Sequence, residues 1–374
     1  MTTSKNPLVL AAEQGQSLWF DFIQRSLMQS GQLKSLIDSD GISGITSNPA
    51  IFESAIANTD EYDQQIADIS AADPAAAPMD IFKQLAIRDI AAAADLFAPV
   101  YQAGRGDDGM VSLEVSPDLA HDTEGTVVQA RELHSALGRD NVMIKVPGTE
   151  AGVAAFEQLT AEGISVNVTL LFSVPRYREI VAAYLSGLEK RRTADKPINK
   201  IASVASFFVS RVDSAVDGQL ESHTETERAQ ALQGKVAIAN AKVAYAHYQQ
   251  TFGSADFHQL QQAGALPQRL LWASTGTKNP AYSDVYYVEE LIGPNTVNTL
   301  PPKTMDAFRD HGQVKNRLEQ NLDAAQGTLD ELADLGIDLD AITAKLEADG
   351  VSSFADAFQR LLGAIEQKRD KLAS

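Results

Sequence analysis

Short apolar runs alternate with longer helical patterns along most of the chain. The runs are rich in β-branched and aromatic residues, and the segments between them repeat apolar residues at helical spacing. This alternation is typical of a parallel sheet whose strands are joined by helices. We expect strands at residues 18–21, 42–46, 110–115, around Lys145, and at 164–170, 201–208, 269–274 and 296–299. Eight strands in a chain of 374 residues favour a (β/α)8 TIM barrel with additional helices over a doubly wound sheet.

The helical patterns between these runs vary in length. We expect helices at residues 81–97, 123–137, 177–190 and 227–250, an insertion at 57–79 and a polar loop at 253–268. Residues from about 304 to 374 are expected to be helical, with an apolar face formed by Phe354, Phe358, Leu361, Leu362 and Ile365. Residues 1–374 should therefore form a single barrel domain with this C-terminal segment packed on it.

The charge of the chain limits its partners. With 31 basic and 50 acidic residues, its net charge is −19, which argues against nucleic acid or an anionic membrane as a partner. An anionic substrate would need a local cationic pocket. The oligomeric state stays open.

Composition also narrows the chemistry and the location. The chain has no cysteine, which excludes disulfides, thiolate catalysis and cysteine-bound zinc. Residues 1–7 are polar, residues 8–10 are too short for a signal sequence, and no apolar run approaches the length of a membrane span. We therefore expect a cytoplasmic protein.

Lys145 stands in the middle of the apolar run 141–149 and is followed by a Pro-Gly turn. Strand residues alternate faces, so Lys145 points the same way as Met143, toward the sheet interior or the mouth of a barrel. Desolvation disfavours an ammonium ion, and a neutral amine can attack a carbonyl to form an imine. The alternative is a lysine at a strand end whose stem is buried while its charged head reaches water.

Polar side chains also end the other expected strands. In a barrel the active site lies at the carboxyl ends of the strands. Capping of the next helix could explain each such residue alone. Their convergence on one lysine favours a shared site, which comprises Asp21, Asn48, Glu114, Lys145, Asn167, Thr169, Ser206 and Ser274.

This set contains what imine chemistry requires. A lysine attacks a ketone, one carboxylate moves protons as the carbinolamine becomes an imine, and a second can deprotonate a substrate hydroxyl. A protonated imine is itself an electron sink, so we expect neither a metal nor a cofactor. The six histidines show no paired ligand spacing, and no glycine-rich nucleotide-binding motif is present.

Four motifs, in this order, resemble the transaldolase family. They are Gly44-Ile45-Thr46-Ser47-Asn48-Pro49, Ser112-Leu113-Glu114-Val115-Ser116, Ile144-Lys145-Val146-Pro147-Gly148-Thr149 and Asn167-Val168-Thr169-Leu170-Leu171-Phe172-Ser173. The resemblance covers roughly residues 15–300. It implies a Schiff-base enzyme of the pentose phosphate pathway that moves a dihydroxyacetone unit from sedoheptulose 7-phosphate to glyceraldehyde 3-phosphate, giving erythrose 4-phosphate and fructose 6-phosphate.

The resemblance also implies a role for each matching residue. Lys145 would form the imine, Asp21 would take the C4 hydroxyl proton, and Glu114 with Thr169 would hold a proton-shuttling water. The substrate would be bound by Asn48 and Asn167 at the dihydroxyacetone unit and by Ser206 and Arg211 at the phosphate. Where many relatives place a second phosphate arginine, this chain reads Ala273-Ser274-Thr275-Gly276-Thr277-Lys278-Asn279, so Lys278 is the expected substitute.

Two other functions remain open at this point. An aldolase of the fructose 6-phosphate type would use the same imine but release free dihydroxyacetone. A metal-dependent hydrolase or a non-catalytic sugar-phosphate binder would need no nucleophilic lysine, and the hydrolase would need a ligand cluster that the sequence does not show.

Overall fold

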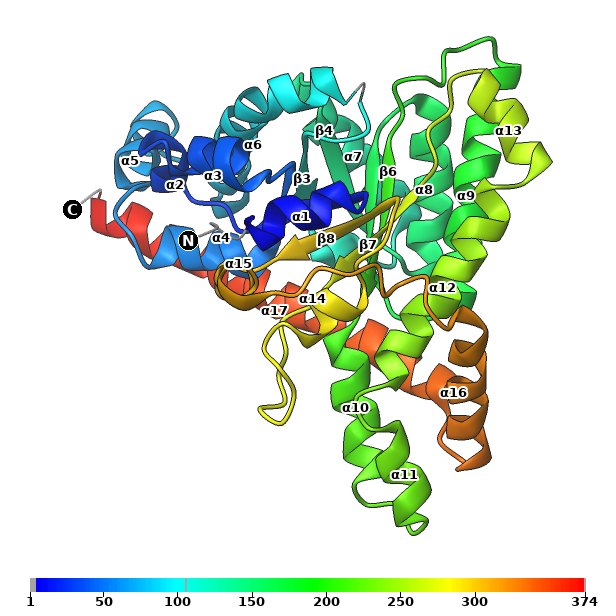
Figure 1. Ribbon diagram of the computed structural model, residues 1–374. Coiled ribbons are helices and arrows are strands. Elements are labelled where there is room, and N and C mark those ends of the chain that lie inside the picture. The colour runs from blue at the N-terminus through cyan, green and yellow to red at the C-terminus, as the bar shows by residue number, and fades with distance from the viewer. Residues whose placement is uncertain (1–4, 105, 373–374) are drawn as a thin grey trace.

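Eight parallel strands close into a barrel, in the order in which they follow along the chain (Figure 1). The computed structural model describes residues 5–104 and 106–372. The strands are β1 (Gln16–Asp21), β2 (Gly44–Thr46), β3 (Met110–Glu114), β4 (Val142–Pro147), β5 (Val166–Leu171), β6 (Ser203–Phe208), β7 (Arg269–Ala273) and β8 (Thr296–Leu300). The predicted (β/α)8 barrel is confirmed.

Helices surround the barrel and extend beyond it (Figure 1). Those in the first half of the chain are α1 (Pro7–Glu13), α2 (Arg25–Gln29), α3 (Gln32–Asp40), α4 (Pro49–Ala57), α5 (Asp63–Ala72), α6 (Pro78–Ala103), the 3-10 helix η1 (Pro117–Leu119), α7 (Thr123–Leu137) and α8 (Glu150–Glu162). Those in the second half are α9 (Val174–Thr193), α10 (Ser210–Leu220), α11 (Thr226–Leu232), α12 (Val236–Phe252), α13 (Ala255–Gln262), α14 (Tyr286–Glu290), α15 (Pro302–His311), α16 (Leu322–Asp334) and α17 (Leu339–Leu372).

Local capping explains why several helices begin directly after a strand. The side chains of Asn48, Thr149 and Ser173 each accept a hydrogen bond from a backbone N–H in the first turn of α4, α8 and α9. Because these caps follow β2, β4 and β5, they fix the direction in which the chain leaves the carboxyl end of the barrel. The predicted helix at 123–137 coincides with α7, which Asp122 caps.

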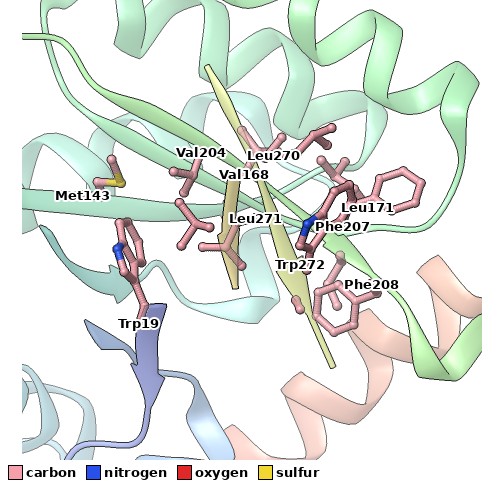
Figure 2. Packing of buried hydrophobic residues seen from close by; sticks show 14 of the residues in the cluster. Trp19, Met143, Val168, Leu171, Val204, Phe207, Phe208, Leu270, Leu271 and Trp272 are labelled. Atoms are coloured by element: carbon pink, nitrogen blue, oxygen red, sulfur yellow. The ribbon is translucent and has the colours of Figure 1, made fainter. Parts of the chain in front are cut away.

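Large apolar side chains from neighbouring strands pack together in the buried core of the molecule (Figure 2). Trp19 on β1 and Trp272 on β7 are both fully buried. Trp19 lies opposite Gly44 in the register of β1 and β2, and a Cβ at Gly44 would come within 2.6 Å of the indole. Glycine at that position therefore leaves the volume that the tryptophan fills.

Two sequence predictions about helices are wrong. The expected polar loop at 253–268 contains α13, whereas the expected insertion at 57–79 is largely helical, with the end of α4, all of α5 and the start of α6. The single helix expected at 227–250 is two helices, α11 and α12, separated by Gly234 with a φ of +69°. The left-handed backbone of Gly234 cannot continue a right-handed helix. The apolar periodicity of the sequence nevertheless runs on across this break, which is why the two helices were predicted as one.

The C-terminal segment covers the end of the barrel at which the strands finish. Helix α17 packs on α4, α5, α6, α10 and β5, and Figure 1 shows it as a long red helix running across the molecule. Four of the five residues of its predicted apolar face are buried; Leu362 is only partly so. A Cβ at Gly350 would lie 2.9 Å from the Leu170 side chain, so α17 approaches β5 closely.

At the other terminus, residues 1–4 of the predicted polar stretch lie outside the described residues, and residues 8–10 belong to α1. Within the described part of the chain, no helix combines the length and the apolarity that crossing a membrane demands.

Candidate active site

A cavity of about 200 Å³ opens at the carboxyl ends of the strands. Seven of the eight strands, or the loops directly after them, contribute to its wall, together with α10 and α17. The lining residues are Asp21, Thr46, Asn48, Lys145, Thr169, Ser206, Phe208, Arg211, Ala273, Ser274, Gly276, Lys278, Thr299, Pro301 and Phe354. Eight of the ten predicted site residues are among them; the two that are not are Glu114 and Asn167.

Lys145 is held at the base of this cavity with only 5% of its surface exposed. Its Nζ donates a hydrogen bond of 3.2 Å to the Ser47 carbonyl oxygen and lies 3.7 Å from Oε2 of Glu114. The Phe354 ring of α17 lies over the amine, with its centroid 5.8 Å from Nζ. The amine is therefore largely removed from bulk water and next to a carboxylate that can exchange protons with it.

Glu114 is a buried acid with an unusual protonation equilibrium. It pairs with Lys145 in the register of β3 and β4, and its side chain is 7% exposed. Burial raises the pKa of Glu114 to about 7; the Lys145 charge opposes this shift and the Asp21 charge adds to it. Its Oε2 has no hydrogen-bond partner among the described residues. A group that titrates near neutral pH beside an amine suits proton transfer.

Asp21 is the second carboxylate near Lys145 and, unlike Glu114, it lines the cavity. Burial raises its pKa, while the Lys145 charge and a hydrogen bond from Thr46 oppose the shift. Thr46 Oγ1 lies 2.6 Å from Asp21 Oδ1 and also 2.6 Å from Thr299 Oγ1. Thr46, on β2, therefore holds one carboxylate oxygen of Asp21, and Thr299, on β8, supports Thr46; among the described residues the other carboxylate oxygen makes no hydrogen bond and can act on a substrate.

Asn167 and Thr169 lie two residues apart on β5, on the same side of the strand, but at different depths. Asn167 is fully buried and is not among the cavity-lining residues; its Nδ2 donates to Ser112 Oγ and its Oδ1 accepts from Ser206 Oγ. Thr169 lines the cavity, and its buried Oγ1 lacks a described partner. Thr169 Oγ1 and Glu114 Oε2 are thus two unsatisfied buried oxygens at the site, a setting in which an ordered water is expected.

Asn48 combines a capping role with a place in the cavity wall. Its Oδ1 accepts from the Ile51 backbone N–H at 3.1 Å, as the capping alternative predicted. Asn48 also lines the cavity, and the two amide N–H donors are not used in the cap. Both interpretations of this residue are compatible with the geometry.

Two cationic side chains line the outer part of the cavity. Arg211, the second residue of α10, has its guanidinium 5.3 Å from the centre of the Phe208 ring. Burial lowers the pKa of Arg211, and no carboxylate within residues 5–104 and 106–372 offsets that effect. Lys278, in the loop after β7, is exposed and lines the same cavity. In a chain of net charge −19, this places two cations at the mouth of one pocket.

Several lining residues were not singled out from the sequence. Thr46 lies inside a quoted motif, and Thr299 is at the end of the expected eighth strand, but neither carried a signal that distinguished it from a strand residue. Phe354 was recognised only as part of an apolar helix face. Its place over Lys145 depends on a contact between distant parts of the chain, which periodicity does not show.

Among the residues that the structure describes, no group of three or more His, Asp or Glu side chains is arranged to hold a metal ion. The expectation of chemistry without a metal or cofactor stays a prediction.

Comparison with known proteins identifies the family. A family model described as Transaldolase/Fructose-6-phosphate aldolase matches residues 18–365. Transaldolase 2 of a Nostoc species is 49% identical over 97% of this chain and 97% of its own length. The transaldolases of Trichodesmium erythraeum and Saccharopolyspora erythraea are 48% and 46% identical, each over at least 98% of both chains. These full-length matches support a transferase with transaldolase activity and do not favour the free aldolase; the chain belongs to the transaldolase/fructose-6-phosphate aldolase family.

Proposed function

We propose that the chain transfers a dihydroxyacetone unit from sedoheptulose 7-phosphate to glyceraldehyde 3-phosphate through an imine on Lys145. The observation that supports this most is the amine itself, buried at the base of a polar cavity with Glu114 at 3.7 Å and Asp21 in the same wall. The products would be erythrose 4-phosphate and fructose 6-phosphate, which places the reaction in the pentose phosphate pathway.

The first step joins the lysine to the ketone. Lys145 passes a proton to Glu114, and the neutral amine attacks the C2 carbonyl to form a carbinolamine. A water between Glu114 and Thr169, whose unsatisfied oxygens would hold it, returns the proton to the C2 hydroxyl. That hydroxyl leaves as water, and a protonated imine remains.

The second step breaks the bond between C3 and C4. Asp21 accepts the proton of the C4 hydroxyl, the aldehyde departs, and the electron pair of the broken bond moves into the iminium to give an enamine. An acceptor aldehyde then enters, the enamine carbon attacks it, and Asp21 returns the proton to the new hydroxyl. Hydrolysis of the imine, by the reverse of the first step, releases the product ketose.

The remaining polar residues would orient the dihydroxyacetone unit. Asn167 uses one N–H and one lone pair on Ser112 and Ser206, so its amide keeps one donor and one acceptor site. Its partners also hold it rigidly. We propose that Asn48 binds the hydroxyl groups of this unit from the cavity wall, and that Asn167, which does not itself line the cavity, acts on the unit through its hydrogen bond with Ser206, which does.

Arg211, with Lys278 and Ser206, is proposed to bind the substrate phosphate. Replacing Arg211 with alanine should raise KM for fructose 6-phosphate by about 10- to 100-fold and lower kcat little, because a charge-assisted contact made in both ground and transition states is lost. Steady-state kinetics with fructose 6-phosphate measure this. An unchanged KM would place the phosphate elsewhere.

The alternative, an aldolase that releases free dihydroxyacetone, differs in the fate of the enamine. The test is to incubate the chain with fructose 6-phosphate, with and without erythrose 4-phosphate, and to quantify sedoheptulose 7-phosphate and free dihydroxyacetone. We expect transfer to exceed release by a wide margin. Release at a comparable rate, independent of the acceptor, would support the aldolase.

Phe354 is expected to help preserve the enamine until the acceptor arrives. Its ring covers Lys145 and lines the cavity, so replacing it with alanine should admit water, which protonates the enamine carbon and leads to free dihydroxyacetone. The ratio of release to transfer should therefore rise. Leu361→Ala, on the same buried face of α17 but not at the cavity, is the matched control and should leave the ratio unchanged. An equal rise in both variants would indicate a general loosening of α17 instead.

Because α17 contributes Phe354 to the site, we also infer that residues 1–374 form one domain with the segment from about 304 to 374 packed on the barrel. A cytoplasmic location is proposed from the sequence, in which we recognise neither a signal sequence nor an apolar run of membrane-spanning length.

A further inference from the structure

Helix α10 carries two buried carboxylates that take no part in the proposed chemistry. Asp213 and Asp217, one turn apart, are 1% and 5% exposed. Asp217 accepts hydrogen bonds from the Gly234 N–H at 3.0 Å and the Tyr282 hydroxyl at 2.8 Å. Asp213 accepts from the Ala237 N–H at 2.7 Å and the Tyr287 hydroxyl at 2.9 Å. Both oxygens of each carboxylate are therefore engaged, two of them by tyrosines from one segment.

That segment follows β7 and carries Lys278. It runs from Ser274 to α14 and is closed on itself by a hydrogen bond from Thr277 Oγ1 to the Ser283 carbonyl oxygen, 2.8 Å long. Figure 1 shows it as the yellow hairpin-like loop between β7 and α14. Lys278 lies inside this closed loop, four residues before Tyr282. The Tyr282–Asp217 bond therefore ties the Lys278 loop to α10.

The break between α11 and α12 completes the connection. Gly234 donates to Asp217 and accepts a hydrogen bond of 2.9 Å from the Tyr286 hydroxyl. A Cβ at this residue would lie 2.7 Å from the Tyr282 ring, and its φ of +69° favours glycine. The helix break that the sequence did not predict is thus the point at which the loop, α10 and α12 meet.

Arg211 is on the same helix as the two carboxylates but faces another way. At 100° per residue, Asp213 and Asp217 are about 160° and 120° around α10 from Arg211. The helix therefore fastens the loop on one side and presents a cation to the cavity on the other. The carboxylates hold the loop without neutralising Arg211.

We propose that Asp217 and Asp213, through Tyr282 and Tyr287, are positioning residues that hold Lys278 beside Arg211 so that both cations act on one substrate phosphate. This inference rests on the proposed function. Lys278 is an exposed point charge on a flexible stem, so its contribution depends on where its backbone is fixed. Ordering the loop before the substrate binds removes that cost from the binding step.

The first test compares Tyr282→Phe with the unmodified chain. We expect KM for fructose 6-phosphate and Kd for inorganic phosphate each to rise about tenfold. We expect kcat to stay within about twofold, and the rate of borohydride-trapped adduct formation with dihydroxyacetone, which has no phosphate, to be unchanged. Tyr245→Phe is the matched control, since its hydroxyl donates to the Pro294 carbonyl oxygen outside the cavity and should affect none of these values. If Tyr282→Phe does not fold, Tyr287→Phe replaces it.

A double-mutant cycle distinguishes positioning from general stabilisation. If Tyr282 acts through Lys278, Tyr282→Phe should have no further effect on phosphate affinity in a Lys278→Ala background. Additive effects of the two changes, equal losses with dihydroxyacetone and with fructose 6-phosphate, or an unaltered phosphate Kd in Tyr282→Phe would each overturn the inference. Failure of the proposed function is distinct, because the unmodified chain would then neither trap dihydroxyacetone nor transfer it from fructose 6-phosphate.

Discussion

Replacing Lys145 with alanine should abolish transfer, leaving no turnover above the uncatalysed reaction. The covalent route needs an amine at C2 of the ketose, and of the lysines in the described part of the chain only Lys278 lines the cavity besides Lys145. Without the imine there is no electron sink for the carbanion, so the whole catalysed route is lost and the rate is not merely reduced. Lys145→Arg should be equally inactive, since a guanidinium keeps the charge but stays protonated.

The control for this prediction is another buried lysine. Lys242 on α12 is 9% exposed and donates to the Gln320 carbonyl oxygen at 2.8 Å, outside the cavity. Lys242→Ala should lower stability but retain transfer per folded molecule. Coupled assays of fructose 6-phosphate formation, normalised to folded protein, separate the two variants. Residual transfer by Lys145→Ala within tenfold of the unmodified chain would contradict the imine mechanism.

Replacing Glu114 with glutamine should lower kcat by roughly 10²- to 10⁴-fold, the usual contribution of a general acid–base group. Glutamine keeps the shape of the side chain but cannot exchange a proton. The effect should also appear in the pH profile, because burial raises the pKa of Glu114 to about 7. Below that pH the carboxyl already carries its proton and cannot accept one from Lys145, so kcat/KM of the unmodified chain should fall as the pH drops below about 7.

In Glu114→Gln this limb of the profile should disappear. Glu347 on α17 provides the matched control, since burial also raises the pKa of this residue but its partner is Arg176, away from the catalytic cavity. Glu347→Gln should keep both the rate and the limb. A limb near pH 7 that persists in Glu114→Gln would assign the titration to a different group, with Asp21 the first candidate.

The barrel and the polar ends of its strands could be predicted because both depend on residues that are neighbours in the sequence. Strands are recognised as short apolar runs, and a lysine inside such a run, as at Lys145, is unusual because lysine is rarely buried without a partner or a function. Asp21 ends its strand both in the prediction and in the structure, and Glu114 ends β3 one residue before the predicted end of that strand. The parts of the site that lie on strand ends were therefore accessible from the chain alone.

The parts that were missed depend on depth, register or long-range packing. Asn167 and Thr169 share a face of β5, but the pattern does not say that only Thr169 reaches the cavity; that follows from the register of β5 between β4 and β6. The break at Gly234 separates two helices whose apolar patterns are continuous in the sequence. Phe354 lies on α17, far along the chain from Lys145 on β4. An amphipathic pattern shows that one face of a helix is apolar but does not show which surface that face covers.

Trapping of the covalent intermediate tests the central claim most directly. The full chain is incubated with fructose 6-phosphate, reduced with borohydride, digested and analysed by mass spectrometry. A dihydroxyacetone-derived adduct on Lys145, absent when either the ketose or the reductant is omitted, is the predicted result. An active chain with no adduct, or with the adduct on another lysine, would contradict the account.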